Sequence, residues 1–292
     1  MGNWTSKWGT ALLAIGLVAV ATVAGAVPGS VRKQVESSLL VTGEVDIEPN
    51  GSVSKIAIDH EEKLPEGVRT FVREAGLHWR FEPVLRDGKP IQARAPMSVR
   101  VVAKKVEGDQ YRITLSGASF ERRDDDSPER VGMVKMDPPA YPERAWRTNA
   151  AGSVYLVVKV GRDGKVQDVV AEQVNLRVLA SEGEMRLLRN VFAKSALAAA
   201  KAWQFRIPTQ GDTVDAPFWN VRVPVSYAMG GQPMEGRADD YGKWISYVPG
   251  PRTLVPWAQD DRAGFSPDAL IDGGVYMADS NAPRLLTPLQ GS

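Results

Sequence analysis

Residues 152–166 read GSVYLVVKVGRDGKV, and this stretch decides the fold. Apolar side chains alternate from Val154 to Val160, which predicts a β-strand with one buried face. The turn at Asp163-Gly164 supplies the positive φ that a tight connection needs, and Val166 begins a return strand. The stretch therefore predicts a β-hairpin.

A helix and a further strand complete the pattern. The helix is expected from about Glu184 to Trp203, with an apolar stripe along one face and an Ala-rich end. Trp203 and Phe205, two positions apart, are then expected to begin a strand. Apolar residues alternate again from Trp219 to Tyr227. A helix packed on one face of a small antiparallel sheet predicts the α+β class.

The same order of features occurs earlier in the chain. An Asn50-Gly51 turn, an apolar helix and the pair Trp79 and Phe81 precede a strand that contains Val99. Trp79 and Trp203 are 124 residues apart, and Val99 and Val221 are 122 apart. A shared order with one insertion of about 11 residues predicts two tandem domains of the same fold. In the first copy, a second hairpin at Glu107-Gly108-Asp109 is expected to add a strand.

The chain divides accordingly into a first domain over residues 38–120, a linker over 121–136, a second domain over 137–229 and a tail over 230–292. The linker contains the charged run from Arg122 to Glu129, which favours a solvated connection because it lacks the spacing of a calcium loop. The tail is rich in Gly and Pro and has little periodicity, so we expect it to be irregular. It either lies across the second domain or stays mobile.

The N-terminus resembles an export signal. Lys7 precedes the apolar run Ala11 to Val23, and Ala24-Gly25-Ala26 gives a small-x-small end. These parts predict a signal peptide over residues 1–26, cleaved after Ala26. The alternative is a membrane anchor, because the 24 residues from Trp8 to Val31 carry no charge. The sequence therefore favours a periplasmic, exported protein, with anchoring in the inner membrane as the alternative.

The composition argues against nucleic-acid binding and against most classes of enzyme. Lys plus Arg number 36 and Asp plus Glu 35, so no basic surface is available for nucleic acid. Cysteine is absent, which excludes disulfides and thiolate catalysis, and only His60 and His78 could serve as imidazole ligands. No nucleophile elbow, phosphate loop or dinucleotide fingerprint occurs. We expect a non-enzymatic protein with no catalytic residue, metal or small-molecule cofactor.

Residues 138–229 resemble the TonB C-terminal domain family. The resemblance rests on Pro139-Ala-Tyr141-Pro142, Gly152-Ser-Val154, Asp163-Gly164-Lys-Val166, Ala199-Ala-Lys-Ala-Trp203-Gln-Phe205 and Val221-Arg-Val223-Pro-Val225. Residues 38–118 resemble a degenerate copy without the Tyr-Pro lead-in. The resemblance implies a periplasmic domain of Gram-negative bacteria that binds a protein partner, such as a TonB-dependent outer-membrane transporter, by pairing its last strand with an extended segment.

The sequence also departs from that family. Pro138 stands where the lead-in often has Gln, and residues 8–31 contain none of the His expected in the helix of an energy transducer. Only residues 27 to about 40 precede the first domain, where transducers have a long Pro-rich spacer. Partner binding is therefore implied more strongly than energy transduction. An envelope scaffold or assembly factor unrelated to transport is the alternative function.

The last strand of the second copy is the predicted binding edge. Pro224 lies within it, and a proline in a strand is typical of an edge. Alternation places Asn220, Arg222 and Ser226 opposite the core, where we expect them to point outward and contact the partner. The family geometry would put Tyr141 and Pro142 beside the same groove. The alternative is that the tail, around Trp244 to Val248, already covers this edge.

Overall fold

The computed structural model describes residues 21–22, 34–105, 111–122, 126–234, 237–258, 262–278 and 282–290. The predicted signal peptide thus lies outside the described residues apart from the short strand β1 (Ala21–Thr22). The expected turn at Glu107-Gly108-Asp109 also lies outside them. Of the helices within the described ranges, none combines the length and the apolar character needed to cross a membrane.

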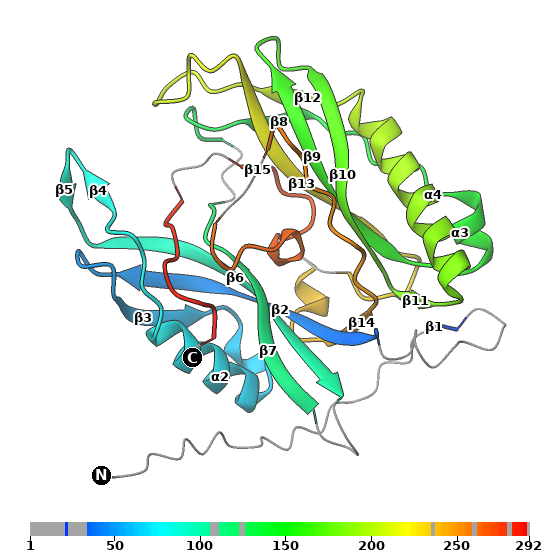
Figure 1. Cartoon of the computed structure of the whole chain (residues 1–292), viewed down its shortest axis with the longest axis horizontal. Helices are drawn as coiled ribbons and strands as arrows, with labels where there is room; N and C mark the ends of the chain where they lie inside the picture. The colour runs from blue at the N-terminus through cyan, green and yellow to red at the C-terminus, as the bar shows by residue number, and fades with distance from the viewer. Residues whose placement is uncertain are drawn as a thin grey trace.

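The first unit is an antiparallel sheet with one helix on its face (Figure 1). The sheet has the order β14-β2-β6-β7, and β3 pairs with β2 beside β14. Its elements are β2 (Glu36–Ile47), β3 (Val53–Ile58), the 3-10 helix η1 (Glu61–Lys63), α2 (Glu66–Leu77), the small hairpin of β4 (Leu85–Arg86) and β5 (Lys89–Pro90), β6 (Ala93–Lys105) and β7 (Tyr111–Ser119). The expected extra strand is present as β7, which pairs with β6.

The second unit repeats this layout with a longer helix. Its sheet has the order β10-β9-β13-β15. Its elements are β8 (Gly132–Lys135), α3 (Glu143–Arg147), β9 (Gly152–Gly161), β10 (Val166–Leu176), β11 (Val178–Leu179), α4 (Glu182–Ala200), β12 (Gln204–Arg206) and β13 (Phe218–Tyr227). β1 pairs in parallel with β11, and β8 pairs with β12. The predicted linker thus includes a strand, while Arg122 and the described residues 126–129 are exposed or half-exposed.

Both hairpins are held to the following strand by the same contact. The amide of Phe81 donates to the carbonyl of Gly51, and that of Phe205 donates to Gly164, each at 2.8 Å. The glycines have φ of 80° and 74°, and a Cβ on either would lie 2.0 or 2.3 Å from the phenylalanine carbonyl oxygen. Only glycine fits both the positive φ and this close approach. The two units therefore share a specific contact as well as a topology.

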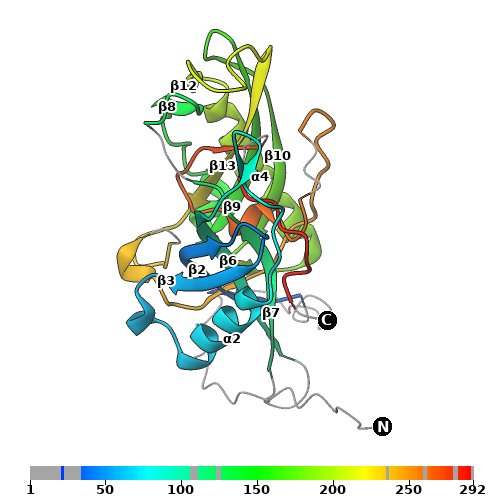
Figure 2. The same cartoon turned by 90° about the vertical axis from the view of Figure 1, so that its left-hand side faces the viewer.

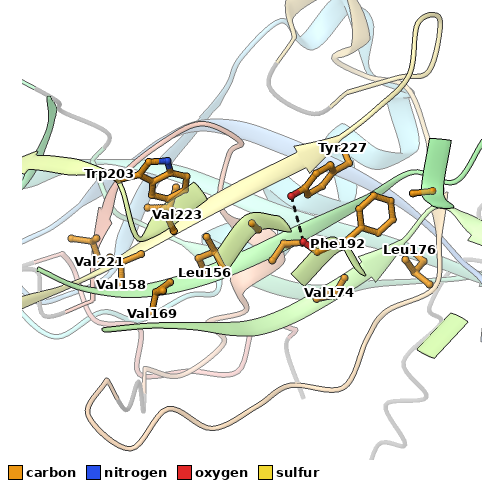
Figure 3. Packing of buried hydrophobic residues seen from close by; sticks show 14 of the residues in the cluster. Leu156, Val158, Val169, Val174, Leu176, Phe192, Trp203, Val221, Val223 and Tyr227 are labelled. Atoms are coloured by element: carbon orange, nitrogen blue, oxygen red, sulfur yellow. Dashed lines mark hydrogen bonds between the residues drawn. The ribbon is translucent and has the colours of Figure 1, made fainter. Parts of the chain in front are cut away.

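Each unit has its own apolar core between helix and sheet. The core of the second unit includes Leu156, Phe192, Trp203 and Val223 (Figure 3). Trp79 occupies the matching place in the first unit, where the helix ends and the chain turns to the sheet. Both indoles are buried, and each indole N–H donates to a main-chain carbonyl, at 3.0 Å for Trp79 and 2.9 Å for Trp203.

The tail beyond Tyr227 runs between and around the two units (Figures 1 and 2). It contains η2 (Ala238–Asp240), β14 (Ile245–Tyr247), η3 (Pro267–Ala269) and β15 (Tyr276–Met277). η3 lies between the two sheets and contacts β6, β7 and β13. The segment around Trp244 to Val248 does not cover β13, because β14 pairs with β2 of the first unit instead. Most of the described residues of the tail lie outside helices and strands, yet the tail contributes Leu285 and Leu289 to the first core.

We predict that Trp79→Ala and Trp203→Ala each lower the free energy of unfolding by about 3–5 kcal/mol, because each removes a buried indole and leaves a cavity. Urea unfolding followed by circular dichroism would measure the loss. Leu254→Ala is the matched control, since Leu254 is 84% exposed and its truncation should change the free energy by less than about 0.5 kcal/mol. An unchanged unfolding curve for Trp203→Ala would instead assign the indole to a binding site.

Candidate functional site

Strand β13 carries most of the predicted binding residues. It pairs with β9 along its whole length, from Phe218 opposite Gly161 to Tyr227 opposite Gly152. Val221 and Val223 face the core under α4, so Asn220 and Arg222 lie on the opposite face of the sheet. The carbonyl of Asn220 points to the outer edge, and alternation places the missing N–H of Pro224 on that same edge.

This outer edge is not open, contrary to the expectation. β15 pairs with it antiparallel, with Met277 opposite Val221 and Tyr276 opposite Arg222. The amide of Ala278 donates to the carbonyl of Asn220 at 2.8 Å. The amide of Gly273 donates to the carbonyl of Pro224 at 3.3 Å, so the edge proline keeps an accepting contact although it cannot donate. Residues 273–278 of the tail therefore cover β13 from Asn220 to Pro224.

Asn220 and Arg222 do not point into solvent, and that expectation is wrong. Their exposed fractions are 5% and 2%. The side-chain amide of Asn220 donates to the carbonyl of Trp257 at 2.8 Å. Alternation along a strand tells which residues face away from the core, but it cannot tell what covers them. Here the tail covers them.

Arg222 forms a buried ion pair with Glu172 of β10. Its Nε lies 2.9 Å from Oε2 of Glu172, and Arg252 of the tail contacts the other carboxylate oxygen at 2.6 Å. The ring of Phe265 stacks against these guanidinium groups, 4.7 Å from that of Arg222 and 5.7 Å from that of Arg252. The carboxylate compensates two cations, and the aromatic face provides a further favourable contact with them.

A second buried carboxylate extends this cluster toward the first unit. Glu121 follows β7 and accepts a hydrogen bond from Arg262, whose guanidinium also stacks on Phe265 at 4.7 Å. Arg130 lies 3.9 Å from the other carboxylate oxygen. Burial raises the pKa of Glu121 above its ordinary value, and the arginines oppose that rise. The cluster thus joins the end of the first sheet, the second sheet and the tail.

Ser226 lies at the less covered end of β13. Its hydroxyl contacts the hydroxyl of Ser153 at 2.9 Å and donates to the carboxylate of Asp272 in the tail. It is half-buried, unlike Asn220 and Arg222. Ser226 is therefore closer to solvent than the other two predicted contacts, although the tail touches it as well.

Tyr141 and Pro142 lie on the other side of the sheet. Pro142 precedes the first turn of α3, and the hydroxyl of Tyr141 donates to the carbonyl of Ala150 at 2.5 Å. The ring of Tyr141 packs edge-on against that of Tyr227, with 5.7 Å between centroids. Burial raises the pKa of Tyr141, and it raises that of Tyr227 to about 12. The lead-in thus reaches the end of β13 from the helix side, and the five predicted residues do not form one surface.

Trp146 is a surface feature that the sequence analysis did not single out. It lies on α3, its exposed fraction is 61%, and its ring is 6.2 Å from that of Tyr141. Tryptophan is seldom this exposed on a protein surface, and it is enriched among the residues that carry binding energy at protein–protein interfaces. Trp146 directly follows the buried Ala145 on α3, and neighbouring helical residues do not share a face, which turns the indole outward. Within the described ranges, no group of three or more His, Asp or Glu side chains is placed to hold a metal ion.

Comparison with known proteins finds a family similar to the second unit. Residues 137–229 match the family described as Gram-negative bacterial TonB protein C-terminal. The chain is also 33% identical over 100 residues to Protein TonB of Xanthomonas campestris pv. campestris strain B100 and to that of strain ATCC 33913. That match covers 34% of this chain, and the chain spans only 38% of the length of these relatives. No solved structure matches the chain significantly.

We predict that Arg222→Met lowers the free energy of unfolding by about 3–5 kcal/mol, because it leaves the buried Glu172 with one cation fewer. Adding Glu172→Gln should recover part of this loss, since the uncompensated charge is then absent. Urea unfolding of the two single variants and the double variant gives the coupling energy. A single variant as stable as the native chain would contradict a structural role for the pair.

Proposed function

We propose that this chain is a non-enzymatic, TonB-like protein-interaction module of the Gram-negative cell envelope. In this proposal β13 binds an extended segment of an envelope protein, such as the plug region of a TonB-dependent outer-membrane transporter, by antiparallel pairing. The observation that carries it is the family match over residues 137–229, which ends just after β13. Residues 38–120 would be a degenerate copy of the same domain. The shared Gly–Phe contact and the equivalent tryptophans support that assignment.

Pairing at β13 requires residues 273–278 to leave the edge. β15 is only two residues long, and two further main-chain bonds flank it. An incoming strand would remake these bonds, so the exchange of backbone partners costs little free energy in itself. Ser226, which contacts Asp272 next to this segment, would then meet the partner directly. Asn220 and Arg222 would meet it only if the tail around Arg252, Trp257 and Phe265 also moved away. Tyr141 and Pro142 would support the end of the strand.

A reversible crosslink can test this exchange. Val221 and Met277 are directly opposite each other and form a non-hydrogen-bonded pair, the geometry in which Cα atoms of antiparallel strands lie closest. The chain contains no cysteine, so Val221→Cys with Met277→Cys would create a single disulfide. We predict that the oxidised form binds a synthetic peptide of a transporter plug N-terminus at least 10-fold more weakly than its reduced form. Fluorescence anisotropy of the labelled peptide measures both affinities.

The reduced form of the same variant is the matched control, because it carries both substitutions without the crosslink. Equal binding by the two forms would contradict pairing at β13. The tail's occupation of the edge specifically favours a second candidate, an envelope scaffold in which β13 is permanently closed. In that case neither form binds the plug peptide.

We further propose that the chain acts in the periplasm after removal of residues 1–26, with an inner-membrane anchor as the alternative. Cleavage after Ala26 predicts that the protein extracted from the periplasm begins at Val27. N-terminal sequencing or intact mass measurement checks this directly. Recovery of the uncleaved chain in the inner-membrane fraction would contradict cleavage and support the anchor.

A further inference from the structure

A small polar cavity of about 20 Å³ lies between strands of the two sheets. Its walls come from β2 and β6 of the first unit, from β9, β10 and β13 of the second, and from β14 of the tail. All the side chains that line it carry a polar group, except that of Ile245. The volume holds about one water-sized sphere, so it admits a water molecule or a monatomic ion and excludes a peptide or an organic molecule.

Asn175 of β10 contributes a hydrogen-bond donor to the wall of this cavity. Its Oδ1 accepts from the main-chain amide of Gly250 at 3.0 Å and from Nε2 of Gln173 at 2.8 Å. A main-chain amide can only donate, so the contact with Gly250 identifies this atom as the oxygen. The side chain is 4% exposed, and its Nδ2 has no acceptor among the described residues. The N–H groups of Nδ2 are therefore left for a molecule in the cavity.

Arg177 contributes a second donor and a positive charge. Its Nη1 donates to the carbonyl of Pro233, and its Nη2 donates to that of Tyr227 at 2.9 Å. Its Nε is buried and has no acceptor in the described part of the chain. Within the same ranges this guanidinium forms no ion pair with a carboxylate. A half-buried cation without a counterion favours an anion beside it.

Hydroxyl groups and carboxylates around the cavity are bonded to one another. Ser153 and Ser226 lie 2.9 Å apart, and Ser226 donates to the carboxylate of Asp272. Because the proton of Ser226 is directed to Asp272, Ser153 donates to Ser226. Asp268 accepts from the hydroxyl of Tyr247 at 3.3 Å, and neither carboxylate lines the cavity. The groups left over are therefore donors, which an anion satisfies better than a water molecule that must also donate its own protons.

We infer that this cavity binds a single chloride ion, held by Nδ2 of Asn175 and Nε of Arg177. The guanidinium of Arg100 also lines the cavity and is 2% exposed, so it adds positive charge to the wall. Because the walls come from both units and the tail, the bound ion would stabilise the packing of all three. This site does not depend on pairing at β13.

The experiment measures urea unfolding of the full chain in sodium chloride and in sodium gluconate at one constant ionic strength. Gluconate is too large for the cavity and serves as the reference anion. We expect chloride to raise the ratio of folded to unfolded chain, by up to about 10-fold for each 10-fold increase in chloride once the site is saturated. In crystals soaked in sodium bromide, the anomalous signal should lie beside Asn175 and Arg177.

Asn175→Asp is the test variant. It keeps the oxygen that accepts from Gly250 and Gln173, and it places a carboxylate where chloride would bind. The dependence of stability on chloride should therefore be lost. Asn50→Asp is the matched control, because it makes the same substitution at an exposed turn and should keep the dependence.

Equal stability of the native chain in chloride and gluconate would overturn the inference and assign the cavity to water. A chloride dependence that survives Asn175→Asp would overturn it as well. Bromide in the cavity without stabilisation in solution would mean an adventitious ion only, which also contradicts the inference. If Asn175→Asp does not fold, the two salts and the bromide position still decide. Failure of the β13 proposal is read separately, from the reduced and oxidised forms with the plug peptide.

Discussion

The ion pair between Arg222 and Glu172 joins two strands of the second sheet to the tail that covers them. Both side chains lie on the sheet face opposite α4, where solvent would ordinarily satisfy them. The tail closes this face, and it brings Arg252 and Phe265 to the same point. Because a buried charge is costly without its partner, the position of the tail and the burial of Arg222 depend on each other. Arg262 and Glu121 extend that dependence to the first sheet.

The tail that closes this face also covers the edges of the sheets. Tail segments cover β13 and the end of β10, and Gly264 bonds to Ala118 near the end of β7. An unpaired edge is an aggregation risk, so covering it from within the chain has a clear physical benefit. β3 is treated differently, with a short strand and an exposed Lys55. Tail segments thus cover parts of these edges, and β14 pairs with β2 beside β3, whereas the outer edge of β3 has no paired strand among the described residues.

The local sequence was sufficient to predict the main helices and strands, but not which of their surfaces the tail covers. The hairpins, the two helices and the Trp–Phe pairs followed from alternation, helical spacing and Asn-Gly or Asp-Gly turns, all of which are set within a few residues. Even so, α4 begins two residues before the expected Glu184, and its buried residues are Met185, Leu188, Phe192, Ala196 and Ala200. The tail could not be predicted, since β14 and β15 are three and two residues long and exist only through distant partners. For the same reason alternation gave the correct face for Asn220 and Arg222, but not their burial beneath the tail.

The contact between Trp79 and Leu289 has a consequence for the order in which the molecule can be completed. The indole of Trp79 donates to a carbonyl 210 residues further along the chain, and Leu285 and Leu289 fill the same core. During synthesis the first unit is made before the second, yet its core is complete only once residues 285–289 have been made. Such long-range closure slows folding, because the intervening chain must be ordered before the contact forms. The part of the protein made first therefore reaches its final packing only after the tail has been made and has folded back onto it.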